Sequence, residues 1–336
     1  MNTYLVTGAA GFIGSHVAQR LLERGDAVVG IDNLNDYYEV GRKRANLEEV
    51  RAATPNTPFQ FVESDIRDRD ALAKIFTKYE FKGIAHLAAM AGVRASIDDP
   101  QLYYDVNLTG TLNLADGAVG RLGTKRETQP NFVFATTSSA YGNTNVIPFL
   151  EEDPCNSPLA PYASSKRGAE LLGHTYHYLH KLQFTALRFF NVYGPRGRPD
   201  MMAYKVLDSI YNGTKVPLYN NGMMHRDWTY VDDIVSGVVS ALDNPQDFEV
   251  VNLGRGNPIL LNDFVVMLEA ITGKKANLVP APMMEADVAY TYADISKAQR
   301  LYGYNPTVTV EDGVQRFFDW YKSAILEKSA TGSPQQ

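Results

Sequence analysis

Two hydroxyl-rich segments of the sequence contain residue types that could transfer a proton. Residues 136–142 read TTSSAYG, and residues 161–166 read PYASSK. Pro161 predicts the start of a helix, which places Tyr162 and Lys166 one turn apart on the same face. Because an ammonium group favours a neighbouring phenolate, we expect Lys166 to lower the pKa of Tyr162 from about 10 and make it a usable base.

The tyrosine–lysine spacing by itself is weak evidence, since hydroxyl-rich turns are also common in ordinary loops. The chain has 20 tyrosines, so a match is expected about once by chance. Tyr211 and Lys215 form a second match, whose intervening Asn-Gly pair favours a turn. The surroundings of Tyr162 favour it instead. TTSSAYG follows a predicted strand, at the sheet edge where ligands bind, so Thr137 and Ser138 could hydrogen-bond the same substrate oxygen.

Apolar runs of strand length alternate with helical stretches through the first half of the chain. Such alternation predicts an α/β fold in which helices cover both faces of a parallel sheet, the doubly wound Rossmann arrangement. The strand-like runs are residues 4–6, 27–31, 59–62, 83–87, 132–135 and 184–190.

A second, smaller α/β region is predicted because the pattern changes near residue 185. Residues 194–199 form a loop, and Asn221-Gly222 predicts a hairpin between residues 216–220 and 224–230. We predict that the two domains are interleaved. The nucleotide-binding Rossmann domain comprises residues 1–180 and 230–255, and the substrate domain comprises residues 181–229 and 256–336.

Gly8, Gly11 and Gly14 follow the first predicted strand and open a helix. Glycines permit a tight turn and close approach of the backbone to a pyrophosphate, while the helix N-terminus offers amide donors and a positive dipole end. The GxxGxxG spacing is typical of Rossmann sites of the short-chain dehydrogenase/reductase type. We therefore predict that this turn binds a dinucleotide.

Asp32 ends the second predicted strand. A carboxylate there accepts hydrogen bonds from the adenosine ribose and repels a 2′-phosphate, so it favours NAD over NADP. Arg42, Lys43 and Arg44 lie nearby, and we expect them on a solvated helix face. Asp65 follows the third strand, where an adenine edge would lie, although a turn or cap role is equally consistent. The predicted cofactor contacts are Gly8, Gly11, Phe12, Ile13, Gly14, Asp32, Asn33, Asp65, Ile66, Leu87, Ala88, Ala89, Asn107, Tyr162 and Lys166.

The composition excludes several classes of function. The net charge of −6 gives no overall attraction to nucleic acid or an anionic membrane, and no stretch of about twenty apolar residues is present. The single cysteine, Cys155, cannot form an intrachain disulfide and suits a reducing compartment. We expect a cytoplasmic protein that binds neither nucleic acid nor membrane. His174, His177 and His180 would point in successively different directions on a helix, and no HExxH motif or cysteine ligand accompanies them. We therefore expect no metal site.

The chain resembles the extended short-chain dehydrogenases/reductases and, among them, the nucleotide-sugar 4-epimerases. The resemblance extends from Met1 to about Lys322 and is carried by TGAAGFIGSH, DNLNDYY, HLAA, YASSK, RFFNVYGP, GRPDM and RDWTYVDDI. DNLNDYY together with GRPDM is most similar to the UDP-glucuronate 4-epimerases. This implies epimerisation at C4 of a UDP-hexuronate through a transient 4-keto sugar, by tightly bound NAD that is regenerated in each turnover.

The resemblance also implies residue roles. Tyr162 would remove the proton of the sugar 4-hydroxyl, Lys166 would hold the nicotinamide ribose, and Arg226 would hold the UDP pyrophosphate. Surface ion pairing is the alternative role for Arg226 and Arg198. The implied catalytic residues are Tyr162, Lys166, Ser138 and Thr137, and the implied substrate contacts are Arg94, Ser138, Ser139, Asn191, Arg198, Arg226 and Asp287.

Related activities stay open at this point. Asn191 stands where glucuronate epimerases usually carry threonine and is closer to UDP-glucose 4-epimerases and UDP-glucuronate decarboxylases. Decarboxylases typically carry a glutamate at the position of Ser139, and 4,6-dehydratases carry an Asp-Glu pair within the TTSSAYG segment. A non-catalytic NAD-binding regulator would commonly lack Tyr162 or Lys166. The resemblance further implies a homodimer formed by helices near residues 101–118 and 162–180.

Overall fold

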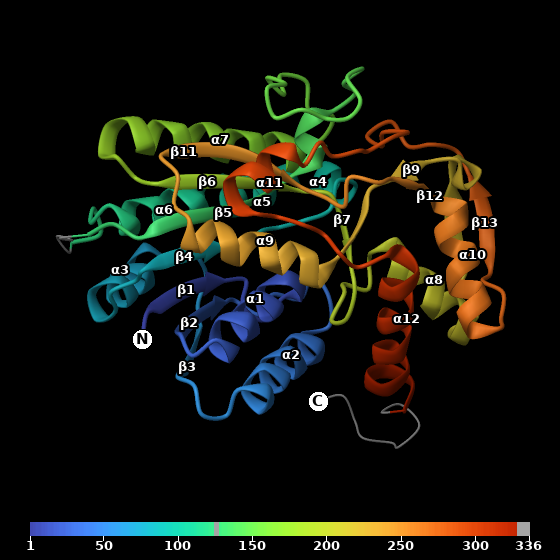
Figure 1. Ribbon diagram of the computed structural model, residues 1–336, viewed down its shortest axis with the longest axis horizontal. Coiled ribbons are helices and arrows are strands. Elements are labelled where there is room, and N and C mark those ends of the chain that lie inside the picture. Colours follow the sequence, from blue (N-terminus) through green and yellow to red (C-terminus); the bar gives the residue numbers. More distant parts are fainter. Residues whose placement is uncertain (124–127, 328–336) are drawn as a thin grey trace.

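The structure is a computed structural model and describes residues 1–123 and 128–327. Residues 328–336, the end of the predicted substrate domain, lie outside the described residues. The central feature is a seven-stranded parallel sheet with the order β11-β6-β5-β4-β1-β2-β3 (Figure 1). Its strands are β1 (Thr3–Thr7), β2 (Ala27–Asp32), β3 (Phe59–Glu63), β4 (Gly83–His86), β5 (Asn131–Thr137), β6 (Phe184–Phe189) and β11 (Phe248–Leu253).

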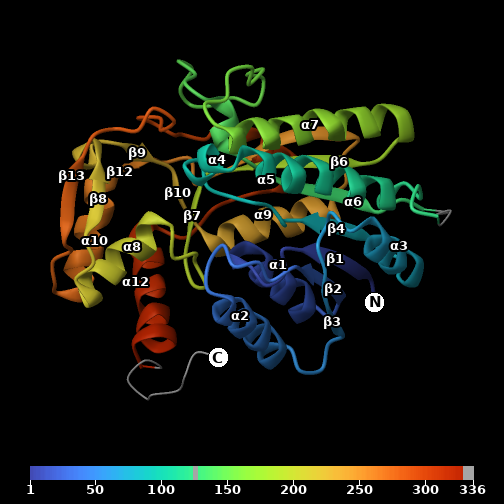
Figure 2. The ribbon, with the colours of Figure 1, turned by 180° about the vertical axis from the view of Figure 1, so that it is seen from behind.

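Helices cover both faces of this sheet, as the alternating pattern predicts. On one face α1 (Phe12–Glu23) packs against α2 (Val40–Ala53) and α9 (Val231–Asp243). The other face carries α3 (Arg69–Lys78), α6 (Gly110–Ala118) and α7 (Pro161–His180), as Figures 1 and 2 show from opposite sides. Alternate residues of the strands enter one of two apolar cores, which is why these strands read as continuous apolar runs. The fold prediction is therefore confirmed.

Of the remaining elements, the helices at residues 202–212, 261–272 and 310–321 and several short strands extend from one end of the sheet (Figure 1), whereas the short helices at residues 100–104 and 296–302 pack on the helices and strands of the sheet itself. Three two-stranded pairings occur among them, namely β7–β10, β8–β13 and β9–β12. The helices are α4 (Ala95–Asp98), α5 (Pro100–Tyr104), α8 (Met202–Asn212), α10 (Leu261–Thr272), α11 (Ser296–Tyr302) and α12 (Val310–Tyr321). The strands are β7 (Asn191–Tyr193), β8 (Val216–Tyr219), β9 (His225–Arg226), β10 (Trp228–Tyr230), β12 (Ile259–Leu260) and β13 (Leu278–Ala281).

Two elements that were predicted to belong to the substrate domain pack in or on the central sheet. β6 pairs within the central sheet although it follows the predicted boundary at residue 180, and α11 packs on β11 and α9. The division into two domains stays a prediction. Within the described residues, no helix combines the length and apolar character needed to span a bilayer.

The predicted hairpin around Asn221-Gly222 is wrong. β8 pairs in parallel with β13, and β9 pairs with β12, so the strands on either side of the turn have different partners. Asn220, Asn221 and Gly222 all have positive φ values, of 49°, 50° and 74°. The chain thus turns at this point, but β8 and β9 leave the turn to pair with β13 and β12.

Candidate active site

The glycine-rich turn between β1 and α1 has no room for side chains at two of its glycines. Gly8 has a φ of +70°, and a Cβ there would lie 2.8 Å from the Ala88 backbone nitrogen. A Cβ at Gly14 would lie 2.0 Å from the Gly8 carbonyl oxygen. The first turn of α1 therefore packs closely on the glycine-rich turn, which in turn packs against the segment after β4, and this backbone borders an open cavity.

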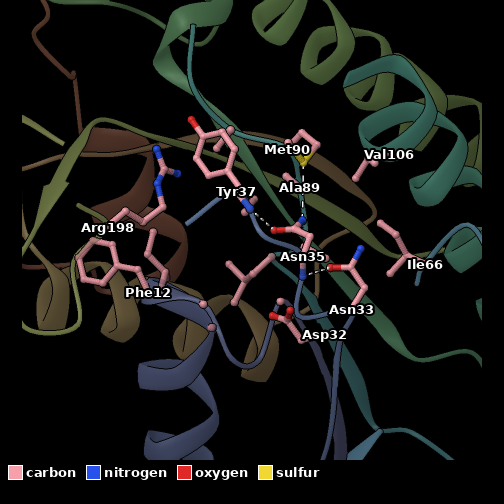
Figure 3. Close-up of a pocket in the computed structure, with 18 of the residues that line it drawn as sticks. Phe12, Asp32, Asn33, Asn35, Tyr37, Ile66, Ala89, Met90, Val106 and Arg198 are labelled. Atoms are coloured by element: carbon pink, nitrogen blue, oxygen red, sulfur yellow. Dashed lines mark hydrogen bonds between the residues drawn. The ribbon is translucent and has the colours of Figure 1, made fainter. Parts of the chain in front are cut away.

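This cavity, the cofactor cavity, lies along the carboxyl ends of β1, β2, β4 and β5 (Figure 3). Among the residues that line it are all the predicted cofactor contacts except one, together with Asn35, Tyr37, Tyr38, Lys43, Ser64, Met90, Val106 and Arg198. The exception is Asn107, which is fully buried behind the wall. Its side chain accepts a hydrogen bond from the Met90 amide at 2.9 Å and donates to Ser165 Oγ at 3.0 Å, so it supports the lining without contacting the cavity.

Asp32 ends β2 at the edge of the cofactor cavity. Its carboxylate accepts hydrogen bonds from the backbone amides of Ala10 (3.2 Å) and Leu34 (2.9 Å), so it also fixes the glycine-rich turn. Burial raises the pKa of Asp32, and the nearby Lys43 ammonium opposes this rise. The carboxylate is thus placed at the strand end where the ribose of a dinucleotide would lie.

The expectation that Lys43 lies on a solvated helix face is wrong. Lys43 is only 5% exposed, lines the cofactor cavity and donates from Nζ to Asn35 Oδ1 at 2.7 Å. Burial lowers its pKa, with Asp32 opposing that change. α2 turns this residue inward and leaves Arg44 on the surface, 3.9 Å from Glu63. A run of three basic residues does not reveal which one faces the core, because successive side chains on a helix differ in direction by about 100°.

We expect Asp32→Asn to lower the preference for NAD over NADP by about tenfold or more, because the charge that would repel a 2′-phosphate is removed. The Lys43 cation stays beside the ribose position. The amide keeps an oxygen for one of the two backbone amides that Asp32 binds. Dissociation constants for both dinucleotides, measured by calorimetry on apoprotein, check this. Glu63→Gln, on the neighbouring strand, is the control and should change neither constant; an unchanged ratio in Asp32→Asn would show that the ribose is read elsewhere.

Asp65 and Asn33 lie together on the lining of the cofactor cavity. Asn33 Nδ2 donates to Asp65 Oδ2 at 2.9 Å, and Arg67 contacts both carboxylate oxygens at 3.0 and 2.8 Å. The hydrogen bond from the Arg67 side chain is the largest influence that lowers the pKa of Asp65 to about 2. The carboxylate is therefore ionised and held in place, as both the adenine-contact and the turn interpretations require.

Lys166 lies one turn after Tyr162 on α7, but its ammonium group is directed to the backbone of β5. Nζ donates to the Ala135 carbonyl at 2.7 Å and lies 4.5 Å from the centre of the Phe134 ring. The residue is 2% exposed, and burial lowers its pKa to about 7, with the Glu170 carboxylate opposing this effect. A buried ammonium is costly unless it is well hydrogen-bonded, so Lys166 is suited to donate to an oxygen of a bound ligand.

The expected lowering of the pKa of Tyr162 by Lys166 is wrong. Burial raises the pKa of the Tyr162 phenol, and the two influences that oppose this rise are a hydrogen bond with Thr137 and the positive charge of Arg198. The reason is geometric, because Lys166 directs its charge to the Ala135 carbonyl. Sequence spacing identifies the helix face but not the direction in which a long side chain points.

The TTSSAYG segment links the cofactor cavity to a second one. Thr137 ends β5, accepts a hydrogen bond from the Ser139 amide at 3.1 Å and lies near enough to Tyr162 to counter the rise in its pKa. Ser138 and Ser139 begin a 3-10 turn (Ser138–Tyr141) and line the second cavity. The hydroxyl groups thus lie between Tyr162 and this second space.

Two adjoining cavities, of about 160 and 400 Å³, share Val93, Asn191, Arg226 and Asp287 as lining residues. We call them together the nucleotide cavity. Burial lowers the pKa of the Arg226 guanidinium, and the Asp287 carboxylate opposes this effect. Arg94 contacts Asp287 at 2.6 Å and stacks 3.7 Å over the Tyr219 ring. The structure therefore brings together the sequence-predicted substrate residues Arg94, Ser138, Ser139, Asn191, Arg226 and Asp287.

Arg198 is placed differently from its expected position. It lines the cofactor cavity and is absent from the residues that line the nucleotide cavity. Its Nε and Nη2 both donate to the Asp200 carboxylate at 2.9 Å, and Asp200 in turn borders the nucleotide cavity. Sequence reasoning missed Tyr37 and Asp200, although the DNLNDYY and GRPDM segments that contain them were the available signal.

Comparison with known proteins places this geometry among nucleotide-sugar enzymes. Residues 5–317 match the family model described as GDP-mannose 4,6 dehydratase. A UDP-glucuronate 4-epimerase of Thermodesulfobacterium geofontis is 43% identical over 97% of this chain and 98% of its own length. The UDP-glucuronic acid 4-epimerase of Bacillus cereus, solved with UDP-glucuronic acid and NAD, has a TM-score of 0.86 at 35% identity and covers 96% of this chain and 99% of its own. The UDP-glucose 4-epimerase of Thermotoga maritima, solved with UDP-glucose, has a TM-score of 0.84 at 31% identity, with coverage of 96% and 99%.

Proposed function

The chain belongs to the nucleotide-sugar epimerase and dehydratase family of extended short-chain dehydrogenases/reductases, and we propose that it is an NAD-dependent UDP-glucuronate 4-epimerase. Such an enzyme is an isomerase that interconverts UDP-glucuronate and UDP-galacturonate. The proposal rests above all on the junction of the two cavities. Tyr162 and Lys166 line the cofactor cavity, and Ser138 and Ser139, which follow Thr137 beside Tyr162, line the nucleotide cavity.

The residues of the cofactor cavity fit NAD. The Gly8 and Gly14 positions leave space only for backbone, which lets a pyrophosphate approach the amides at the start of α1. Asp32 provides a carboxylate for one ribose, and the buried Lys166 ammonium can donate to the other. When bound, NAD supplies the acceptor for the hydride that leaves C4 of the sugar.

Tyr162 is the proton acceptor for the sugar 4-hydroxyl in this proposal. Burial raises the pKa of its phenol, so deprotonation needs support from its neighbours. The Thr137 hydroxyl can donate to the phenolate oxygen, and the Arg198 charge favours the ionised form. Lys166, which lines the same cavity, can hold the cofactor ribose.

A glucuronate substrate adds a second requirement, because its 4-keto form is a β-keto acid that loses carbon dioxide easily. The enzyme must hold the carboxylate so that the bond to it is poorly aligned with the ketone. Ser138 and Ser139 offer hydroxyl donors at the wall of the nucleotide cavity, and neither is the glutamate that decarboxylases typically carry at the position of Ser139. This composition supports an epimerase, which retains the carboxylate, over a decarboxylase.

The UDP group is proposed to bind in the nucleotide cavity, with Arg226 on the pyrophosphate and Asp287 on the uridine ribose. Both side chains border the cavity, and burial lowers the pKa of Arg226 despite the opposing Asp287 charge. A dianionic pyrophosphate would supply a further counter-charge. Arg94 already holds one oxygen of the Asp287 carboxylate, so the ribose would bind the other oxygen.

We expect Arg226→Met to raise the KM for UDP-glucuronate by about 30-fold or more and to change kcat less, because losing a buried charge-assisted contact costs about 2–5 kcal/mol. Initial rates over a range of substrate concentrations check this. Arg255→Met, a substitution of an arginine that lines neither cavity, is the control and should leave KM unchanged. A KM in Arg226→Met within about threefold of the wild-type value would contradict the assignment.

The experiment that tests the proposed function is a product assay with UDP-glucuronate and UDP-glucose side by side. An epimerase for hexuronates converts UDP-glucuronate to UDP-galacturonate and acts poorly on UDP-glucose. A pentose nucleotide would identify a decarboxylase, and an unchanged substrate would indicate a binding protein. Conversion of UDP-glucose to UDP-galactose is the second candidate, which Asn191 and the similarity to the Thermotoga maritima enzyme favour.

We also propose a cytoplasmic homodimer. Leu171, Tyr178 and Leu179 on α7 are 55%, 70% and 63% exposed, and such a group of apolar side chains on one helix supports burial against a second copy. Cys155 is a buried free thiol, which suits a reducing compartment. Sedimentation of the purified protein tests the dimer.

A further inference from the structure

A short loop beside the cofactor cavity contacts three segments that surround the cavity. Residues 194–201, which read GPRGRPDM, join β7 to α8. They are far in sequence from the glycine-rich turn, yet they contact α1, α2 and the segment after β2. We call this loop the strap, and its contacts fall into two groups.

The first group anchors the strap to the two helices beside the glycine-rich turn. His16 Nε2 on α1 donates to the Pro195 carbonyl at 2.9 Å. Arg196 donates from Nε to Glu49 Oε2 on α2 at 2.8 Å and from Nη2 to Gln19 Oε1 on α1 at 2.7 Å. The Arg196 side chain is 8% exposed, and its backbone has a φ of +59°, a conformation that residues other than glycine rarely adopt.

The second group fastens the other end of the strap. Asp200 accepts two hydrogen bonds from Arg198, both at 2.9 Å, and one from the Tyr37 hydroxyl at 3.3 Å. Tyr37 follows β2 and so belongs to the Rossmann sheet side of the cavity. Figure 3 shows Tyr37 and Arg198 at the same side of the cofactor cavity, which both residues line.

We propose that the strap holds the dinucleotide in its cavity between turnovers, and that release requires the Arg196 anchor or the Tyr37–Asp200 bond to open. The proposal rests on the proposed function, in which the cofactor is regenerated in place and has no reason to leave. Tyr37 and Arg198, which fasten one end of the strap, line the cofactor cavity themselves, so a dinucleotide in that cavity would lie against them.

The anchor does not depend on pH near neutrality. Burial and the Arg196 charge lower the pKa of His16 to about 3, so this side chain is neutral and donates to Pro195 at every pH well above that value. The strap therefore acts as a mechanical restraint and needs no titration to close.

The test is the exchange of bound NAD for 1,N6-etheno-NAD in the purified holoenzyme, followed by fluorescence without any sugar nucleotide. Arg196→Met removes both hydrogen bonds of the arginine and roughly keeps its length, and we expect exchange to be about tenfold faster or more. Tyr37→Phe removes one oxygen, and we expect exchange to be roughly three- to tenfold faster.

Each variant has a matched control outside the strap. Arg69→Met removes an arginine on α3 that contacts an aspartate and an asparagine, both at 2.9 Å. Tyr4→Phe removes a tyrosine–aspartate bond of 3.5 Å at the start of β1. Both controls should exchange within about twofold of the wild-type rate, because neither removed bond touches the strap.

Wild-type exchange in Tyr37→Phe overturns the proposal, whether or not Arg196→Met folds. Equal acceleration in the controls and the strap variants overturns it too, because the effect would then be general loosening. If the wild type fails the product assay but the strap variants exchange NAD faster than the wild type does, the proposed function is rejected and the role of the strap is retained. If the wild type epimerises UDP-glucuronate but the strap variants exchange NAD at the wild-type rate, the proposed function is retained and the role of the strap is rejected.

Discussion

Tyr162→Phe is expected to lower kcat by about 10²–10⁴-fold, the usual value of general-base catalysis, while the protein keeps its fold and its bound NAD. The substitution removes the phenolic oxygen that accepts the proton of the sugar 4-hydroxyl. The ring stays and continues to pack edge-on against Tyr103 at 6.2 Å. Turnover of UDP-glucuronate and the NAD content of the purified variant are the two measurements.

The control for this prediction is Tyr211→Phe. Tyr211 and Lys215 have the same sequence spacing as Tyr162 and Lys166, but Tyr211 lies on α8 and stacks on Phe318 at 6.3 Å. It lines neither the cofactor cavity nor the nucleotide cavity. We expect wild-type turnover in this variant. More than about a tenth of the wild-type rate in Tyr162→Phe would be incompatible with a base at this position.

Lys166→Met is expected to have opposite effects on activity and stability. Turnover should fall about 100-fold or more, because the ammonium that would hold the nicotinamide ribose is gone. The free energy of unfolding near pH 7 should rise, because a cation with 2% exposure is replaced by an apolar side chain of similar length. Such a trade-off is common where an active site places a charge in a buried position.

The stability of the wild type should rise with pH relative to this variant. Burial lowers the pKa of Lys166 from 10.5 to about 7 in the folded state. The unfolded chain therefore binds more protons between these two values, so the destabilisation by this lysine is full below the folded-state pKa and declines as the pH rises above it.

Thermal unfolding at two pH values measures this destabilisation. The difference in Tm between wild type and Lys166→Met, both without bound NAD, should shift in favour of the wild type between about pH 7 and 9. Burial holds the pKa of His86 well below its ordinary value and raises that of Tyr162, so neither neighbour titrates in this interval. A Tm difference that does not change with pH would mean that Lys166 is not charged and buried as the structure places it.

The sequence predicted the sheet well because its strands are buried on both faces. Continuous apolar runs such as residues 27–31 and 132–135 are typical of strands in a sheet with helices on both sides. The glycine-rich turn was equally predictable, since only glycine fits where a Cβ at Gly14 would lie 2.0 Å from a carbonyl oxygen. These features depend on local sequence and on rules that hold for parallel sheets in general.

The prediction of a hairpin at Asn221-Gly222 was wrong because the strands on either side of the turn pair with other strands. β8 pairs with β13, which comes much later in the chain, and nothing in the local sequence of either strand specifies that pairing. Local turn signals predict that the chain bends but not what each strand pairs with afterwards.

Most of the residues that line the two cavities could be named from the sequence, but the directions of their long side chains could not. Spacing placed Tyr162 and Lys166 on one helix face, but the direction of the ammonium depends on the Ala135 carbonyl, which only the packing of α7 on β5 brings near. Arg198 and Lys43 were assigned to other surroundings because long side chains can reach either side of a loop or helix. The strap was hidden because its contacts join distant segments, such as two residues 163 positions apart.

The most direct test of epimerisation by a retained dinucleotide uses UDP-glucuronate that carries deuterium at C4. If this hydrogen is transferred to bound NAD and returned within one active site, UDP-galacturonate will keep the deuterium at C4, and NAD added to the solution will acquire none. Product that has exchanged its C4 deuterium for solvent hydrogen, or deuterium that appears in the added NAD, would contradict redox chemistry at C4 by a retained dinucleotide.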